Sequence, residues 1–283
     1  MQSPEERATI ASMGALLGPE ILSAVQNLYR LPHEATAALE PAVANASYGK
    51  DPRQVLDVYA PSAQTSAAPV LLWVHGGGFL RGSKGGDGDP YNAHVGRWAA
   101  RCGMVGAVMN YRLAPMHQWP AGSEDVGLAL DWLTNNVSAY GGDPKRIFLI
   151  GTSAGAAHIA GHLRLRPETP AKGAVLLSGL YGFTPLDKRD TQYFGSADLF
   201  PERSARNAVV VTPIPLLVAG AEFDPSRFQA ELTGLLAARL ERHGRLPRLH
   251  SATGHNHFSI AYHLGTADTR LSDEILSFIG DPR

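Results

Sequence analysis

The sequence predicts an α/β fold in which helices cover both faces of a mostly parallel, doubly wound sheet. Apolar runs that suit strands buried on both faces recur along the chain, at residues 70–75, 104–109, 147–150, 174–177 and 215–218. Helical patterns separate these runs almost throughout. Strands that alternate with helices are joined by right-handed crossovers, so the sheet is expected to lie between two helical layers.

Capping signals and periodicity predict the remaining elements. Ser3 and Glu6 form a capping box, and Gly18 divides residues 3–30 into two amphipathic helices. Ser123 is expected to cap another helix. Further helices are predicted at residues 90–101, 123–139, 154–165, 225–243 and 272–279, and further strands at 54–59 and 248–251.

The chain has 283 residues, which is enough for one large domain with a deep core. We therefore expect residues 1–283 to form a single domain. The N-terminal helices of residues 1–46 are expected to pack near the active site, where together with a later insert they would form a small cap.

Composition argues against several classes of partner. The formal net charge of -1 provides no attraction to nucleic acid or to an anionic membrane. No apolar run approaches the roughly 18 residues that a membrane span needs, and the acidic N-terminus lacks the apolar core of a secretory signal. Cys102 is the single cysteine, which fits a reducing compartment. We expect a cytoplasmic protein, with a homodimer left open.

One short motif points to a nucleophile. Residues 151–155, Gly-Thr-Ser-Ala-Gly, match the pattern G-x-S-x-G, follow a predicted buried strand and open a predicted helix. In this context the pattern is typical of a serine held on a sharp strand-to-helix turn. A corner built only for close helix packing would also explain both glycines. The context favours Ser153 as a nucleophile.

A glycine-rich loop follows another predicted strand. His75, three glycines and Phe79 come directly after the apolar run that ends at Val74. Consecutive glycines allow several backbone N–H groups to point into one small volume, which suits stabilisation of an oxyanion. The alternative is an ordinary flexible loop after a strand.

A nucleophilic serine needs a histidine base and a carboxylate that orients the histidine. Both should lie at the carboxyl ends of strands, where open α/β sheets bind ligands. Asp224 follows one predicted strand and suits a helix cap as well, with Glu222 as the alternative acid. His255 and His257 follow the last predicted strand, and spacing alone does not separate them.

Taken together, these motifs resemble the α/β-hydrolase family, and within it the hormone-sensitive-lipase-like and kynurenine-formamidase-like carboxylesterases. The residues that carry the resemblance are 75–79, 111–115 with 124–125, 151–155, 222–225 and 257–258, in the chain order serine, aspartate, histidine. The resemblance implies an α/β-hydrolase fold. It also implies that Ser153 is the nucleophile, Asp224 the acid and His257 the base. The implied oxyanion donors are the backbone N–H groups of Gly77, Gly78 and Ala154.

The resemblance also suggests supporting roles. Residues 111–115 look structural, with Arg112 pairing with Glu124 or Asp125 behind the site. The aromatic segment 181–206 either lines the substrate pocket or forms an ordinary hydrophobic cluster. The residues expected to contact substrate are Phe79, Phe223, Phe258 and Tyr193.

The sequence thus predicts a serine esterase that cleaves small carboxylic esters without a metal or organic cofactor. Two histidines four residues apart, His158 and His162, lack a third ligand and are expected to be helix-packing residues rather than a zinc site. Two alternatives stay open: an arylformamidase that acts on N-formylkynurenine, and an inactive ligand-binding protein on the same fold.

Overall fold

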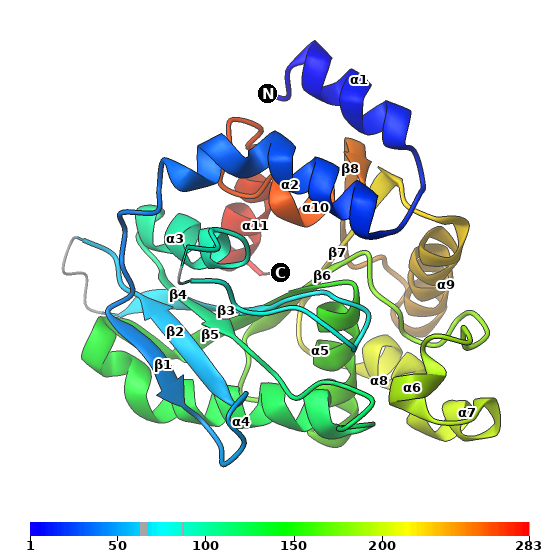
Figure 1. Cartoon of the computed structure of the whole chain (residues 1–283). Coiled ribbons are helices and arrows are strands. Elements are labelled where there is room, and N and C mark those ends of the chain that lie inside the picture. Colours follow the sequence, from blue (N-terminus) through cyan, green and yellow to red (C-terminus); the bar gives the residue numbers. More distant parts are fainter. Residues whose placement is uncertain (63–66, 87, 283) are drawn as a thin grey trace.

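Eight strands form one sheet in the computed structural model, which describes residues 1–62, 67–86 and 88–282 (Figure 1). Their spatial order is β1-β2-β4-β3-β5-β6-β7-β8. β2 runs antiparallel to β1 and β4, and the other neighbours pair in parallel. The strands are Val43–Ser47, Val55–Tyr59, Ala68–Val74, Val105–Met109, Gly142–Thr152, Gly173–Leu177, Leu216–Phe223 and Arg248–Asn256. The predicted mostly parallel, doubly wound sheet is confirmed.

Helices cover both faces of this sheet. Figure 1 shows α3 and α11 on one side and α4 and α5 on the other. Among the described residues, no helix combines the length and the apolar character needed to cross a membrane. The helices α1 to α11 are Pro4–Met13, Pro19–Glu34, Ala93–Arg101, Ala121–Asn136, Ala154–Leu165, Thr191–Phe194, Phe200–Arg203, Arg206–Val211, Ser226–His243, Ser259–Tyr262 and Arg270–Gly280.

The central strand β3 explains why its sequence is continuously apolar. Val70, Leu72 and Val74 belong to the core cluster under α4, α5 and α9. Leu71 and Trp73 belong to the cluster under α3 and α11. Since successive side chains of a strand point to opposite faces, a strand between two helical layers must be apolar at every position.

The N-terminal helices form as predicted, and Gly18 separates them. The Oγ of Ser3 accepts a hydrogen bond from the Glu6 N–H at 3.1 Å, which caps α1. α2 runs beside α10 (Figure 1). Within the region expected to be helical up to residue 46, however, Val43–Ser47 is the edge strand β1. This strand is short, mostly exposed and antiparallel, so its sequence carries no buried-strand signal.

Several other boundaries differ from expectation. α4 begins at Ala121 rather than at Ser123, and the Ser123 side chain is buried against α5 instead of capping. β5 begins at Gly142, before its predicted start, and β7 and β8 extend to Phe223 and Asn256, well beyond the predicted strand ends. Most of the added residues of β7 and β8 are small or polar and lack an apolar pattern, yet the two strands pair with each other as far as Phe223 and Asn256.

His158 is a buried imidazole on α5 surrounded by aromatic rings. The ring lies edge-on to Phe79, Tyr111 and Tyr193, with centroid distances of 5.3, 4.4 and 5.1 Å. Within the described chain neither ring nitrogen has a hydrogen-bond partner. Burial therefore lowers the pKa of His158 to about 3. The expected packing role for this histidine agrees with these contacts.

Replacing His158 with leucine should make the fold less sensitive to acid. Between about pH 6.5 and pH 3 the unfolded chain protonates this histidine and the native chain does not, so native stability falls as pH falls. The variant lacks this histidine, so its free energy of unfolding should fall less steeply as pH falls. The difference in slope is at most roughly 1.4 kcal/mol per pH unit. Urea unfolding at several pH values measures the difference. An unchanged pH slope, equal to that of a control His243→Gln variant at an exposed position of α9, would contradict the explanation.

Candidate active site

Ser153 occupies a sharp turn between β5 and α5. Its φ is +53°, a left-handed backbone conformation that is unfavourable for a residue with a Cβ. The turn is tight because a Cβ on Gly155 would overlap the Val74 carbonyl oxygen, and one on Gly151 would lie 2.7 Å from the Gly155 backbone. The small residues therefore let the start of α5 pack directly on the central strands and hold the Ser153 hydroxyl at the edge of the sheet.

The carboxyl ends of β7 and β8 bring two more side chains to this serine. His257 Nε2 lies 3.0 Å from Ser153 Oγ, and His257 Nδ1 lies 2.8 Å from Asp224 Oδ1. Because a carboxylate only accepts, Nδ1 carries the proton and Nε2 is left to accept from the serine hydroxyl. Asp224 and His257 are both buried.

Asp224 is itself held by neighbours that sequence reasoning did not identify. Ser178 Oγ donates to Asp224 Oδ2 at 2.6 Å, and the Ala221 N–H donates to the same oxygen at 2.8 Å. Ser178 directly follows β6, at the same edge of the sheet as Ser153. Its place just after a predicted strand was a signal that could have been used.

The glycine loop that follows β3 lies beside Ser153. Gly77 and Gly78 have φ values of +131° and +59°, and within the described chain their N–H groups have no acceptor. Ala154 is the first residue of α5 and is buried at the same corner. The Tyr111 hydroxyl donates to the His75 carbonyl at 2.9 Å and so holds the start of the loop. These amides remain available to a bound group.

Behind the loop, Arg112 forms the ion pairs that the resemblance suggested. Its guanidinium lies 2.7 Å from Asp125 Oδ1 and 3.1 Å from Glu124 Oε2. Asp125 is fully buried and also accepts from the Gln54 side chain at 2.7 Å. Both alternatives for the partner of Arg112 are therefore present together.

A cavity of about 680 Å³ opens at Ser153 and His257. Gly76–Gly78 line one side of it, and Phe228 and Phe258 line another. These two rings lie 4.0 and 5.7 Å from the His257 ring, centroid to centroid. The site therefore combines a largely apolar wall with a few polar groups, as small-molecule sites commonly do.

The N-terminal region contributes to the same cavity. Leu17, Gly18 and Pro19 line it together with Leu22 and Gln26 of α2. Tyr91, which also lines the cavity, is joined to α2, because its hydroxyl donates to the Gln26 carbonyl at 2.6 Å. These N-terminal residues thus border the cavity that opens at Ser153.

Three of the four residues expected to contact substrate lie elsewhere, and only Phe258 lines the cavity. Phe79 stacks on Tyr193 at a centroid distance of 4.6 Å, and both rings are buried in a cluster beneath the loop. Phe223 packs beside α1 and α2 in the cluster of Ile10. Packing explains where these three rings lie, since large apolar rings are most stable when removed from water.

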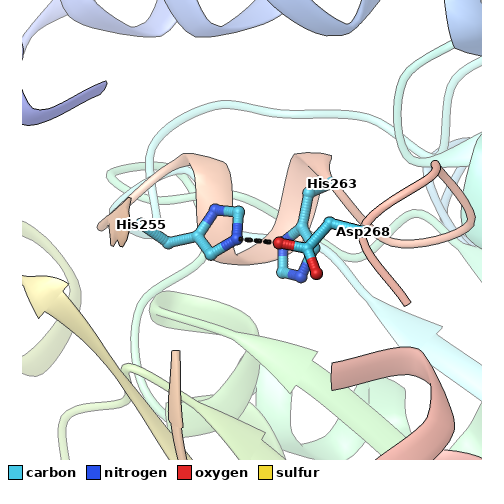
Figure 2. Close-up of side chains that lie close together, drawn as sticks. All are labelled: His255, His263 and Asp268. Carbon is cyan, nitrogen blue, oxygen red and sulfur yellow. Dashed lines mark hydrogen bonds and ion pairs between the residues drawn. The ribbon is translucent and has the colours of Figure 1, made fainter. Parts of the chain in front are cut away.

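His255, the alternative base, points toward His263 and Asp268 in a buried cluster (Figure 2). Its Nε2 lies 3.2 Å from Asp268 Oδ2, and its ring stacks on His263 at 3.8 Å. Burial lowers the pKa of His255 to about 4, so this imidazole is neutral near pH 7. The structure brings His257, and not His255, to Ser153.

The same cluster has three side chains of the kind that bind metals. Ligand atoms of His255, His263 and Asp268 lie within 4.8 Å of one another (Figure 2). Arg270, however, donates to both carboxylate oxygens of Asp268, at 2.8 and 2.5 Å. Its positive charge opposes a cation at the same place, so the arrangement is that of an ion pair between a buried carboxylate and an exposed arginine.

Glu231 on α9 organises the segment that follows β6. Its carboxylate accepts hydrogen bonds from the four backbone N–H groups of residues 181–184, at 2.7 to 3.2 Å, and from the Thr184 hydroxyl at 2.6 Å. Arg227, one turn earlier on α9, donates to Asp190 Oδ2 at 2.6 Å. A carboxylate on the buried stripe of a predicted helix was the signal that sequence reasoning missed.

Comparison with solved structures identifies the fold. An esterase from Pyrobaculum calidifontis aligns over 99% of this chain and 98% of its own, with a TM-score of 0.72 and 24% identity. An arylesterase structure aligns over 100% of this chain with a TM-score of 0.68 and 21% identity. The BD-FAE family model matches residues 56–168, which include the glycine loop and Ser153. These likenesses show that the chain has the α/β-hydrolase fold.

Curated relatives match this chain over part of their length. A probable carboxylic ester hydrolase of Mycobacterium tuberculosis is 31% identical over 204 residues, which is 62% of this chain and 46% of the relative. A phenmedipham hydrolase of Pseudarthrobacter oxydans is 41% identical over 111 residues, which is 37% of this chain and 22% of the relative. The chain thus spans less than half the length of each of these two relatives.

Replacing Glu231 with glutamine should destabilise the protein. An amide offers one acceptor oxygen and turns its NH₂ group toward backbone donors, so buried N–H groups of residues 181–184 lose their partner. We expect the free energy of unfolding to fall by about 2–4 kcal/mol.

Urea unfolding measures this change. Glu241→Gln, at an exposed position of the same helix, is the matched control and should lie within about 0.5 kcal/mol of the parent protein. Equal stability of the two variants would show that Glu231 does not hold the segment.

Proposed function

We propose that this protein is a carboxylesterase that cleaves small carboxylic esters through an acyl-enzyme. The observation that carries the proposal is the continuous hydrogen-bond chain from Ser153 Oγ to His257 Nε2 at 3.0 Å and from His257 Nδ1 to Asp224 Oδ1 at 2.8 Å. The cavity in front of the serine supplies room for a small substrate. The esterase names of the similar proteins agree with this activity.

In the first half of the proposed reaction, His257 Nε2 takes the proton of the Ser153 hydroxyl as Oγ attacks the ester carbonyl. Asp224 stabilises the resulting imidazolium. The carbonyl oxygen becomes an oxyanion and accepts hydrogen bonds from the N–H groups of Gly77, Gly78 and Ala154. One such donor is typically worth about 10²- to 10³-fold in turnover.

The intermediate then collapses. The bond to the alcohol oxygen breaks, the alcohol takes the proton from His257, and the acyl group stays on Ser153 Oγ. In the second half, His257 takes a proton from a water molecule, which attacks the acyl carbon. Return of that proton to Ser153 Oγ releases the carboxylic acid and restores the site.

The structural setting suits this role. The whole chain, residues 1–283, would act as one domain, with the N-terminal region of residues 1–46 covering the cavity. The strained backbone of Ser153 holds its hydroxyl at the sheet edge, where substrate and His257 both reach it. No observation of the site favours the arylformamidase or the inactive binding protein over an esterase.

Replacing Ser153 with alanine should abolish hydrolysis. Loss of the attacking oxygen removes the acyl-enzyme route, so kcat for a short-chain nitrophenyl ester should fall by about 10⁴-fold or more. Circular dichroism should show an unchanged fold. Ser138→Ala, at an exposed position, is the control and should retain the parent activity.

A covalent probe provides a second measurement. A fluorophosphonate should label Ser153 in the parent protein, and mass spectrometry should find the adduct on the peptide that contains it. Retained turnover in the Ser153→Ala variant, or labelling at another serine, would refute the assignment.

A further inference from the structure

Arg189 places a positive charge directly beside the glycine loop. This residue lies on the segment after β6, and its side chain lines the same cavity as Ser153. A Cβ built on Gly78 would lie 3.5 Å from Arg189 Cζ and 3.8 Å from one terminal guanidinium nitrogen. The guanidinium therefore lies beside Gly78, one of the proposed oxyanion donors, in the cavity where the ester would bind.

The guanidinium of Arg189 is not engaged by a strong partner within the described chain. Its acidic neighbour is Asp190, at a distance of 3.6 Å from Arg189 Nε to Asp190 Oδ1. That is too long for a hydrogen bond. The other carboxylate oxygen of Asp190 is bound by Arg227 at 2.6 Å. The N–H groups of Arg189 are thus free to bind a ligand. The side chain lines the cavity, and 45% of its surface is exposed to solvent.

The charges around the cavity leave this arginine unbalanced. Among the described lining residues the permanent charges are Arg81, Arg189 and Asp89. Arg81 and Asp89 act with opposite sign on the pKa of the Tyr262 hydroxyl, which places both near α10. They offset each other there, because neighbouring opposite charges largely cancel at a distance. The third charge is that of Arg189, beside Gly78, and it is only partly balanced, because Asp190 is shared with Arg227.

The segment that carries Arg189 is fixed on α9. Glu231 binds the backbone of residues 181–184, and Arg227 binds Asp190, the next residue after Arg189. The polypeptide is therefore held on both sides of Arg189 by buried or half-buried groups. A preorganised guanidinium loses little freedom when it binds an anion, and its planar fork matches the geometry of a carboxylate.

We propose that Arg189 is a specificity-determining residue that binds a carboxylate of the substrate, so that esters with an anionic acid or alcohol half are preferred over neutral ones. This inference rests on the proposed esterase function of Ser153. The chemical class is a half-ester of a dicarboxylic acid, or an ester of a carboxylate-bearing alcohol or phenol.

Two matched pairs of esters test the proposal. Monoethyl glutarate and ethyl pentanoate differ by a carboxylate in place of a methyl group on the acid half. 4-Acetoxybenzoate and 4-methylphenyl acetate differ in the same way on the alcohol half. For each pair the ratio of kcat/KM, anionic over neutral, is measured in the parent protein and in Arg189→Gln, Arg189→Lys and Arg242→Gln variants.

We expect Arg189→Gln to lower this ratio about 10- to 100-fold in at least one pair, the effect of one hydrogen-bonded charged contact. The neutral ester reports any loss common to both substrates. Arg189→Lys should recover part of the ratio, since it keeps the charge and loses the fork. Added salt should reduce the ratio in the parent protein. Arg242, exposed on α9, is the control, and its variant should keep the parent ratio.

Other results would overturn the inference and leave the esterase function standing. Hydrolysis of the neutral esters with an unchanged ratio in Arg189→Gln for both pairs is one such result, and parent protein that hydrolyses only the neutral members is another. Failure of the proposed function has a different signature, namely no hydrolysis of any ester together with no fluorophosphonate labelling of Ser153.

Protection from the probe covers the case in which Ser153 is labelled but none of the four esters turns over. Monoethyl glutarate or 4-acetoxybenzoate should then slow labelling in the parent protein and not in Arg189→Gln. Equal protection in both proteins, or none in either, would refute the anion site.

Discussion

The close approach of α5 to the central strands is the constraint on which the site depends. Gly155 lies so near the Val74 carbonyl that a side chain there would overlap it, and Ser153 adopts a left-handed conformation at the corner. A wider turn would relieve the strain but would withdraw the hydroxyl from the edge where β7 and β8 end. The strain is offset by the buried packing of the helix and strands on either side.

The topology of the sheet explains why the other polar residues of the site lie close to Ser153. Parallel strands end at one edge, so residues far apart in the chain meet there: Ser153 after β5, Ser178 after β6, Asp224 after β7 and His257 after β8. Each is held through a neighbour on an adjacent strand. α9 then ties the segment after β6 to the same scaffold, which extends rigid support from the serine to the rim of the cavity.

The sequence predicted best those elements for which a local residue pattern has a single structural outcome. The buried strands, the helix after Ser153 and the glycine loop follow from apolar runs and small residues, and the structure contains them. The roles of residues that depend on contacts with distant parts of the sequence were harder to predict. His255 and His257 are two residues apart, but His255 belongs to β8 and His257 to the turn after it. The end of the strand therefore lets one side chain reach Asp268 and the other Asp224.

The same limit applies to the cavity walls. Aromatic residues near a loop were expected to contact substrate, yet Phe79 and Tyr193 bury each other, since composition does not tell which rings find a partner. The lining residues Leu22 and Gln26 come from a helix more than a hundred residues before Ser153, and nothing local marks them. Polar groups such as Ser178 were detectable in principle, because they follow a strand that the sequence already predicts.

The attachment made by Glu231 has a consequence for how such a protein can diversify. Four of its five bonds go to main-chain N–H groups, which every residue except proline possesses. The exposed residues further along the segment, 187–189, can therefore be exchanged without releasing it from the helix beneath it. While Glu231 is kept, the backbone of this segment stays in place beside the cavity. Substitutions on the segment can then change the selectivity of the site without a change of fold.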